Sequence, residues 1–325
     1  MIKKTALLFL LAVVGGQVVY SQTLTDSIRQ LFIYDDYPAA VRLCDSALHQ
    51  GLADSAAVFS LKSKALDALG QKGQAVRTAQ QAVQQDSLSA EYRFALGKLY
   101  FQAKRYSLAQ ALFGQLWQED SSRVLTGMYL ARIYTLYSQH LNALDVYDQL
   151  TATDSTKAVY YRNRGKTLVK LRKNGPATQS FARAVALDST DIISMRYLAK
   201  LLTQDGEYDR ALQLLARVRQ LDPDNPLVYT ALGDVNQQRN HHYRAVPHYK
   251  QALQKGGKIF NNSLKLGKSL VAIEQYRQAA DYLRPLTTMA DNADVCWYLG
   301  EAYSILEMPD SALVFLERAI TLYNP

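Results

Sequence analysis

The stretch LGKLYFQAKRYSLAQALF, residues 96–113, decides the fold. The small residue Gly97 lies twelve positions before Ala109, and Phe113 follows one helical turn after that alanine. Small and apolar residues spaced three or four positions apart make one face of a helix. The stretch therefore predicts two helices that approach each other closely, with a short polar turn between them.

An alanine recurs along the whole chain at intervals of 33 to 35 residues. Most of these alanines have a small residue twelve positions before them and a large one four positions after. Such a period is typical of stacked helix–turn–helix units, each of which buries its apolar face only against its neighbours. The recurring alanines are Ala40, Ala75, Ala109, Ala143, Ala177, Ala211, Ala245, Ala279 and Ala312.

This pattern resembles the tetratricopeptide repeat family, in residues 96–113 and again at Leu299-Gly300-x-x-Tyr303 with Ala312. The resemblance implies an all-α fold, namely an α-solenoid superhelix of stacked antiparallel helix–turn–helix repeats, and it implies binding of a protein partner. We expect the array to cover residues 22–325. Its nine units start near residues 21, 56, 90, 124, 158, 192, 226, 260 and 293.

Asp-Ser pairs stand at four junctions between units, at residues 86–87, 120–121, 154–155 and 188–189. Both residue types are good helix N-caps. We expect each pair to end one hairpin and to start the next helix.

Residues 1–21 read as a signal peptide. Lys3 and Lys4 precede an apolar run over residues 6–14, and small residues lead to a cleavage site near Ser21/Gln22. The run is too short for a typical membrane span. We expect an exported protein, periplasmic or secreted, that does not span a membrane once mature; the alternative is an uncleaved anchor.

The sequence offers no catalytic constellation, and we expect no enzyme activity, cofactor or metal. His241, His242 and His248 form the one histidine cluster, but a turn and a proline separate them, and zinc normally recruits three or four ligands. Cys44 and Cys296 fall at core positions near opposite ends of the array, so we expect two buried thiols.

A row of charged residues is the strongest candidate site. At position 9 of the units, where the family's first helices face a concave groove, seven of nine residues are basic. Aligned like charges attract anions, whereas a solvated helix face is the alternative. The candidate groove residues are Arg29, Lys64, Lys98, Arg132, Arg162, Lys166, Lys170, Arg196, Lys200 and Lys268, with the aromatic residues Tyr129 and Tyr197 beside them.

A net charge of +8 over 325 residues fits an acidic ligand. We expect an extended or acidic protein segment in the groove, in the bacterial cell envelope, and no nucleic acid. Two alternatives stay open: a binder of anionic glycan, and an accessory subunit of an envelope enzyme or secretion complex.

Two features near the C-terminus suggest further behaviour. Pro247, Pro285 and the pair Gly256-Gly257 interrupt units seven and eight, so either a hinge lies there or the stack continues through kinked helices. Val314, Phe315 and Leu322 lack a capping helix and either lie partly exposed or mediate self-association through the C-terminal end.

Overall fold

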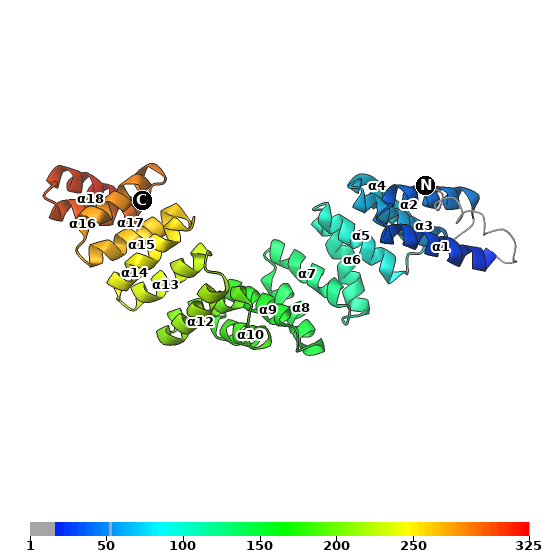
Figure 1. The fold of residues 1–325 in the computed structure, drawn as a ribbon, viewed down its shortest axis with the longest axis horizontal. Coiled ribbons are helices and arrows are strands. Elements are labelled where there is room, and N and C mark those ends of the chain that lie inside the picture. Colours follow the sequence, from blue (N-terminus) through cyan, green and yellow to red (C-terminus); the bar gives the residue numbers. More distant parts are fainter. Residues whose placement is uncertain (1–16, 52–53, 325) are drawn as a thin grey trace. The chain divides into compact units, whose positions relative to one another are not determined.

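A computed structural model describes residues 17–51 and 54–324 of the chain (Figure 1). These residues form eighteen α-helices and one 3₁₀ helix and include no strand, so the all-α prediction is confirmed. Eighteen helices fit nine two-helix repeats. The helices are α1 Gln17–Ile33, α2 Tyr37–Gln50, α3 Ser55–Ala68, α4 Lys72–Gln85, α5 Ala90–Gln102, α6 Tyr106–Glu119, α7 Val124–Leu136, α8 His140–Thr153, α9 Ala158–Lys170, α10 Asn174–Leu187, α11 Ile192–Gln204, α12 Tyr208–Leu221, α13 Pro226–Gln238, α14 His242–Gln254, α15 Ile259–Ala272, α16 Tyr276–Leu283, η1 Arg284–Thr288, α17 Ala293–Ile305 and α18 Pro309–Tyr323.

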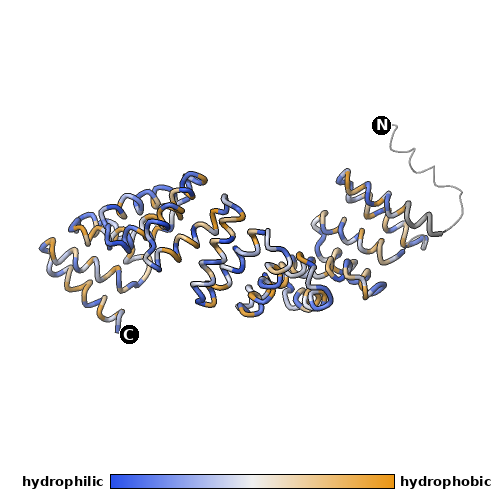
Figure 2. Tube along the Cα trace, turned by 90° about the horizontal axis from the view of Figure 1, so that it is seen from below, coloured by the Kyte–Doolittle hydropathy of each residue, from blue (hydrophilic) through white to orange (hydrophobic). Residues whose placement is uncertain are grey.

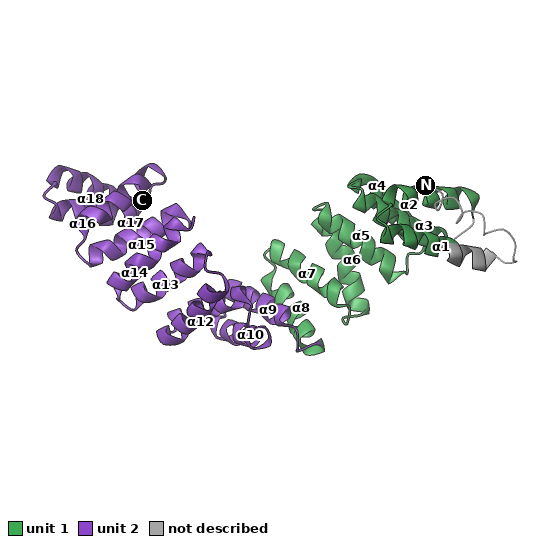
Figure 3. Cartoon of the chain, in the orientation of Figure 1, with its two compact units in different colours: residues 1–153 green, residues 154–325 purple. Residues whose placement is uncertain are grey.

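The chain divides into two units, Met1–Thr153 and Asp154–Pro325 (Figure 3). The first contains α1–α8 and the second α9–α18. Within each unit, odd-numbered first helices pair with the even-numbered second helices that follow them. Apolar and polar positions alternate along these helices, so each buries one face (Figure 2). Of the expected signal peptide, residues 1–16 lie outside the described residues, and α1 runs through the expected cleavage site.

Close contact between the two helices of a pair rests on small residues. Ala177 of α10 is fully buried. Gly165 of α9 faces the Phe181 ring so closely that an added Cβ would lie 2.8 Å from Cζ. Gly97 meets Phe113 in the same way, and Ser63 donates a hydrogen bond to the Ala75 carbonyl at 3.0 Å. The predicted partnership of a small residue with a large one four positions after the alanine is therefore confirmed.

The turn between the paired helices places one residue in the left-handed region, at φ of 54° to 80°. Only Gly70 and Gly206 are glycines there. At the other turns a residue with a side chain adopts this strained backbone conformation, because the packing of the neighbouring helices holds the turn in place. The non-glycine residues are Asp35, Lys104, Ser138, Arg172, Asn240, Glu274 and Glu307.

The junctions between pairs differ from the expected Asp-Ser caps. Asp120 and Asp188 end the preceding helices, as predicted, but their carboxylates accept hydrogen bonds from the residue two positions on. The next N-cap comes later, at Ser89, Arg123, Lys157 or Asp191. The prediction that the pair starts the helix is wrong, because the Asp oxygen is used within its own turn.

These turns give the fold a dependence on pH. The Ser122, Thr156 and Thr190 hydroxyls, and then their backbone amides, donate to the carboxylates of Asp120, Asp154 and Asp188, and this holds the pKa of each Asp below its usual value. A pKa depressed below the unfolded value of about 3.9 stabilises the fold above that pH, and this is lost as pH falls through the folded pKa.

We therefore expect the free energy of unfolding to fall as pH is lowered from about 5 to about 3. A triple variant with Asp120, Asp154 and Asp188 changed to Asn should show a smaller fall, because its amides do not titrate. Urea unfolding at several pH values measures both slopes. Equal slopes would contradict the assignment.

The region of Pro247 and Pro285 shows no interruption of the core. One cluster of buried residues joins α14 through α18, including Tyr249, Leu266, Leu283 and Leu299. Gly256 and Gly257 close α14, since their amides donate to the carbonyls of Leu253 and Ala252. The stack therefore continues across this junction within the second unit.

The two prolines have different effects on their helices. Pro247 lies inside α14, which runs on to Gln254. At Pro285 the α-helix gives way: α16 ends at Leu283, and Pro285 lies in the 3₁₀ helix η1. Proline lacks the amide hydrogen that an α-helix interior needs, which explains the shortened helix.

Candidate functional site

The position-9 residues all lie on first helices, and we call them the basic row. In the first unit the row is Arg29, Lys64, Lys98 and Arg132; in the second it is Lys166, Lys200, Asp234, Lys268 and Glu301. Every basic member is exposed except Lys166, which is half-buried. Their surroundings differ, and the difference decides which of them can bind a ligand.

The first two members are already paired within the chain. The Arg29 guanidinium lies 3.1 Å from the Asp26 carboxylate. The Lys64 ammonium lies 3.0 Å from the Glu91 carboxylate, which belongs to the first turn of the next first helix. Exposed ion pairs of this kind contribute little to stability. They do, however, neutralise the charge that a ligand would meet.

Lys98 and Arg132 meet different groups. Lys98 has no carboxylate partner in the described part of the chain. The Arg132 guanidinium lies over the Phe101 ring, 5.0 Å from its centroid, which is a cation–π contact. Tyr129 is half-buried in an aromatic cluster, 5.1 Å from Phe101 and stacked on Phe113 at 5.2 Å. This part of the first-helix surface is therefore both cationic and aromatic.

In the second unit Arg162 forms a structural ion pair. Its guanidinium lies 3.2 Å from the carboxylate of Asp191, whose side chain is only 1% exposed. Asp191 also caps α11 by accepting hydrogen bonds from the Ser194 amide at 3.2 Å and the Ser194 hydroxyl at 2.6 Å. Arg162 thus balances a buried charge at the start of α11.

Lys166 and Lys170 lie on the same helix α9 as Arg162, and neither has a carboxylate partner among the described residues. Burial, and then the like charge of Arg162, lower the pKa of Lys166, whereas the charge of Asp191 raises it. A carboxylate brought to Lys166 would favour its ammonium form further.

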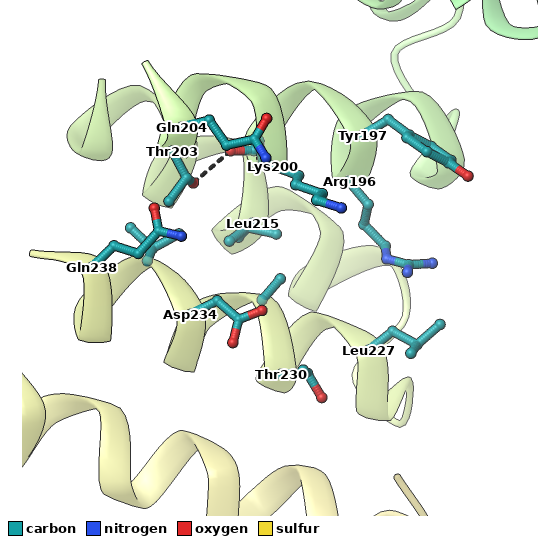
Figure 4. A pocket seen from close by; sticks show the side chains of 13 residues that line it. Arg196, Tyr197, Lys200, Thr203, Gln204, Leu215, Leu227, Thr230, Asp234 and Gln238 are labelled. Carbon is teal, nitrogen blue, oxygen red and sulfur yellow. Dashed lines mark hydrogen bonds between the residues drawn. The ribbon is translucent and has the colours of Figure 1, made fainter. Parts of the chain in front are cut away.

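A pocket of about 320 Å³ opens between α11 and α13 (Figure 4). Most of its lining comes from these two neighbouring first helices. From α11 come Arg196, Tyr197, Lys200 and Gln204, and from α13 come Leu227, Thr230, Asp234 and Gln238. The structure therefore brings three of the predicted site residues, Arg196, Tyr197 and Lys200, to one open cavity.

The cations of this pocket are not neutralised within it. Arg196 and Lys200 have no carboxylate partner among the described residues, and burial lowers the pKa of Arg196. The buried Arg196 Nε has no hydrogen-bond partner. Tyr197 stacks on Phe181, with ring centroids 5.0 Å apart, and so forms part of the wall.

Asp234, the acidic member of the row in this pocket, already has partners within the chain. Its carboxylate oxygens lie 2.7 and 2.8 Å from the Lys265 ammonium. The Tyr249 hydroxyl donates to it at 2.8 Å. Burial, and then the Asp234 charge, raise the pKa of Tyr249. The pocket thus keeps a net positive charge, although Asp234 interrupts the row of basic residues in the sequence.

The remaining basic residue, Lys268, lies over the Tyr298 ring at 5.8 Å. Sequence reasoning missed three residues that determine the surroundings of the row, namely Glu91, Asp191 and Lys265. Each follows a row residue or its helix by about one repeat. Comparing charges at equivalent positions of neighbouring units would have found them.

The described residues contain no group of three or more His, Cys, Asp or Glu side chains that could hold a metal ion. Burial lowers the pKa of His242 and of His248. Cys44 and Cys296 are both buried, as predicted, and burial raises the pKa of the Cys44 thiol to about 12. A thiol protonated to this extent is a poor nucleophile.

Two further predictions concern the membrane and the C-terminal helix. None of the helices in residues 17–51 and 54–324 combines the length and the apolar character that a bilayer span requires. On α18, Leu313, Val314 and Ile320 are exposed, whereas Phe315 and Leu322 are half-buried.

Two models of the tetratricopeptide repeat match the chain, at residues 60–122 and 194–235. These two stretches of the chain carry tetratricopeptide repeats. A tetratricopeptide repeat protein from Parabacteroides merdae has a TM-score of 0.57 at 16% identity, over 80% of this chain and 99% of that one. The C-terminal part of a repeat protein from Cytophaga hutchinsonii has a TM-score of 0.59 at 13% identity, over 71% and 95%.

The structure of PilW, a type IV pilus biogenesis factor, has a TM-score of 0.54 at 18% identity, over 61% of this chain and 92% of that one. At such identities the likeness establishes the tetratricopeptide fold. A comparison with curated proteins found no match.

Proposed function

We propose that this chain is a non-catalytic scaffold that binds an acidic or extended protein segment along its first helices. The observation that carries the proposal is the set of cations without a carboxylate partner among the described residues. In the second unit these are Lys166, Arg196 and Lys200, of which Arg196 and Lys200 line an open pocket, and in the first unit Lys98 is another. Unpaired cations attract carboxylates. Tetratricopeptide repeats mediate protein–protein interactions, which agrees with this use.

The proposed place of action is the bacterial cell envelope. Lys3, Lys4 and the apolar run over residues 6–14 support export, with cleavage near Ser21/Gln22. N-terminal sequencing of the protein recovered from its native cells tests this part. Gln22 at the N-terminus is expected, whereas an intact leader would contradict cleavage.

Capture from an envelope extract tests the binding surface. The bait is the mature chain, compared with a variant in which Arg132, Lys166 and Lys200 are changed to Glu. A matched control changes three exposed arginines of second helices to Glu: Arg77, Arg183 and Arg219.

We expect one protein to be captured by the mature chain and the control, and lost with the first variant. Equal capture by all three would contradict a role for the basic row. Capture of anionic glycan instead, with affinity that falls steeply with salt and ignores protein sequence, would favour the alternative ligand.

A further inference from the structure

The Lys64–Glu91 ion pair shows how neighbouring repeats meet on the first-helix surface. The two residues are 27 positions apart, and their charged atoms lie 3.0 Å apart. Lys64 is the ninth residue of its repeat, whereas Glu91 is in the first turn of the next repeat's first helix. The ninth residue of one repeat therefore reaches the second residue of the following one. We call such a pair of positions a rung.

The same spacing leads from other lysines of the row to aliphatic residues. Lys98 is followed at 27 positions by Leu125, Lys166 by Ile193, and Lys200 by Leu227. Where the first of these rungs has a carboxylate, the later ones have a leucine or isoleucine. Each of these three lysines accordingly lacks a carboxylate partner in the described residues.

The aliphatic members of these rungs are open to solvent. Leu125 is 63% exposed, Ile193 40% and Leu227 41%. Leu227 lines the same pocket as Lys200, and Figure 4 shows the two side chains on facing helices of that pocket. An open rung thus combines an unpaired ammonium with an exposed apolar side chain. A ligand that completes it must offer both a carboxylate and an apolar group.

The spacing of the rungs constrains the ligand further. Packed helices lie about 8–10 Å apart, and an extended chain advances about 3.1–3.4 Å per residue. Three residues of an extended segment therefore span one rung. A segment with one acidic and one aliphatic residue in every three presents the two groups in register with successive rungs.

We propose that the ligand of this surface is an extended segment in which an aliphatic and an acidic residue recur every third position. The inference rests on the proposed function and specifies the chemistry of the partner. Within the second unit the carboxylates pair with Lys166 and Lys200, and the aliphatic side chains cover Ile193 and Leu227. Lys98 and Leu125 form a separate open rung in the first unit. The rung of Lys64 is closed by Glu91 and takes no part.

Two labelled synthetic peptides of equal composition test the proposal on the mature chain. One contains five Leu-Glu-Ser triplets, and the other has the same residues with all leucines gathered at one end. We expect the triplet peptide to bind at least tenfold more tightly. Equal affinity would show that charge alone is recognised and would overturn the pattern.

Single substitutions test the rung formed by Lys200 and Leu227, with a control outside the rungs. Leu227→Glu places a carboxylate at the spacing that pairs Lys64 with Glu91, and should weaken the triplet peptide at least tenfold while keeping Lys200. Lys200→Gln removes the ammonium of the same rung and should weaken binding of the triplet peptide to a similar extent. Leu141→Glu, at a 62% exposed residue of α8, makes the same chemical change outside the rungs and should alter affinity less than twofold.

The outcomes separate this inference from the proposed function. If neither peptide binds, or Leu227→Glu and Lys200→Gln leave the affinity unchanged, the inference is wrong. The proposed function would then still stand or fall by the capture experiment. Circular dichroism of each variant confirms folding, and because Leu227 and Leu141 are exposed, glutamate buries no new charge at either position.

Discussion

Replacing Phe181 by alanine is expected to lower the free energy of unfolding of the second unit by about 3–5 kcal/mol. The ring is fully buried between α9 and α10, against Gly165. It also stacks on Tyr197 of α11, with the rings inclined by 8°. Truncation removes this transfer energy and leaves a cavity, because Gly165 has no side chain that could fill it.

The size of this effect follows from the position of Phe181 in the repeat. It joins the two helices of one pair to the first helix of the next, so its loss weakens the stacking on which a repeat array depends. Urea unfolding followed by circular dichroism, which reports helix loss, measures the change. A loss below about 1 kcal/mol would contradict the packing described.

Gly175→Ala is the matched control within the same helix. An added Cβ there has no atom within 4 Å. The substitution should be neutral or stabilise the helix by up to about 1 kcal/mol, since alanine restricts the unfolded chain. By contrast, Gly165→Ala should destabilise by about 1–3 kcal/mol, because its Cβ would press on the Phe181 ring.

The second large effect is expected for Asp191→Ala, at about 3 kcal/mol. The change removes the N-cap of α11 and leaves Arg162 without its carboxylate. The cost is limited because the Arg162 side chain is 26% exposed and keeps part of its hydration. Denaturant unfolding measures the loss.

Two further substitutions separate the parts of this effect. Asp191→Asn keeps a capping oxygen but removes the charge, so it should cost less than the alanine change. Asp209→Ala breaks an ion pair with Arg239 in which the Asp209 side chain is 80% exposed, and should cost under about 1 kcal/mol. If Asp191→Ala costs no more than Asp209→Ala, the buried pair has no structural role.

Much of the fold could be predicted because tetratricopeptide packing depends on residue size at fixed intervals. Ala177, Gly165 and Phe181 have the required sizes, and the structure places them in contact as expected. The junctions were harder to predict, because Asp188 has two uses for its carboxylate. It accepts from Thr190 in its own turn, and local hydrogen bonds of this kind compete with helix capping.

The basic row could be located from the sequence, but its charge balance could not. Lys64 and Lys200 occupy equivalent positions, yet among the described residues only Lys64 has a carboxylate partner. Arg162 is committed to Asp191, and Asp234 to Lys265. Such pairs form between helices of neighbouring repeats, so their geometry depends on stacking.

Photo-crosslinking in the native cells tests most directly whether a protein partner lies on the first-helix surface. A photoreactive amino acid replaces Gln204, which lines the pocket on α11, or Gln213, an exposed residue of the adjacent second helix α12. The two sites begin with the same residue type on neighbouring helices. We predict a discrete crosslinked protein from position 204 and none from position 213. Crosslinks only from position 213, or none from either, would contradict the account.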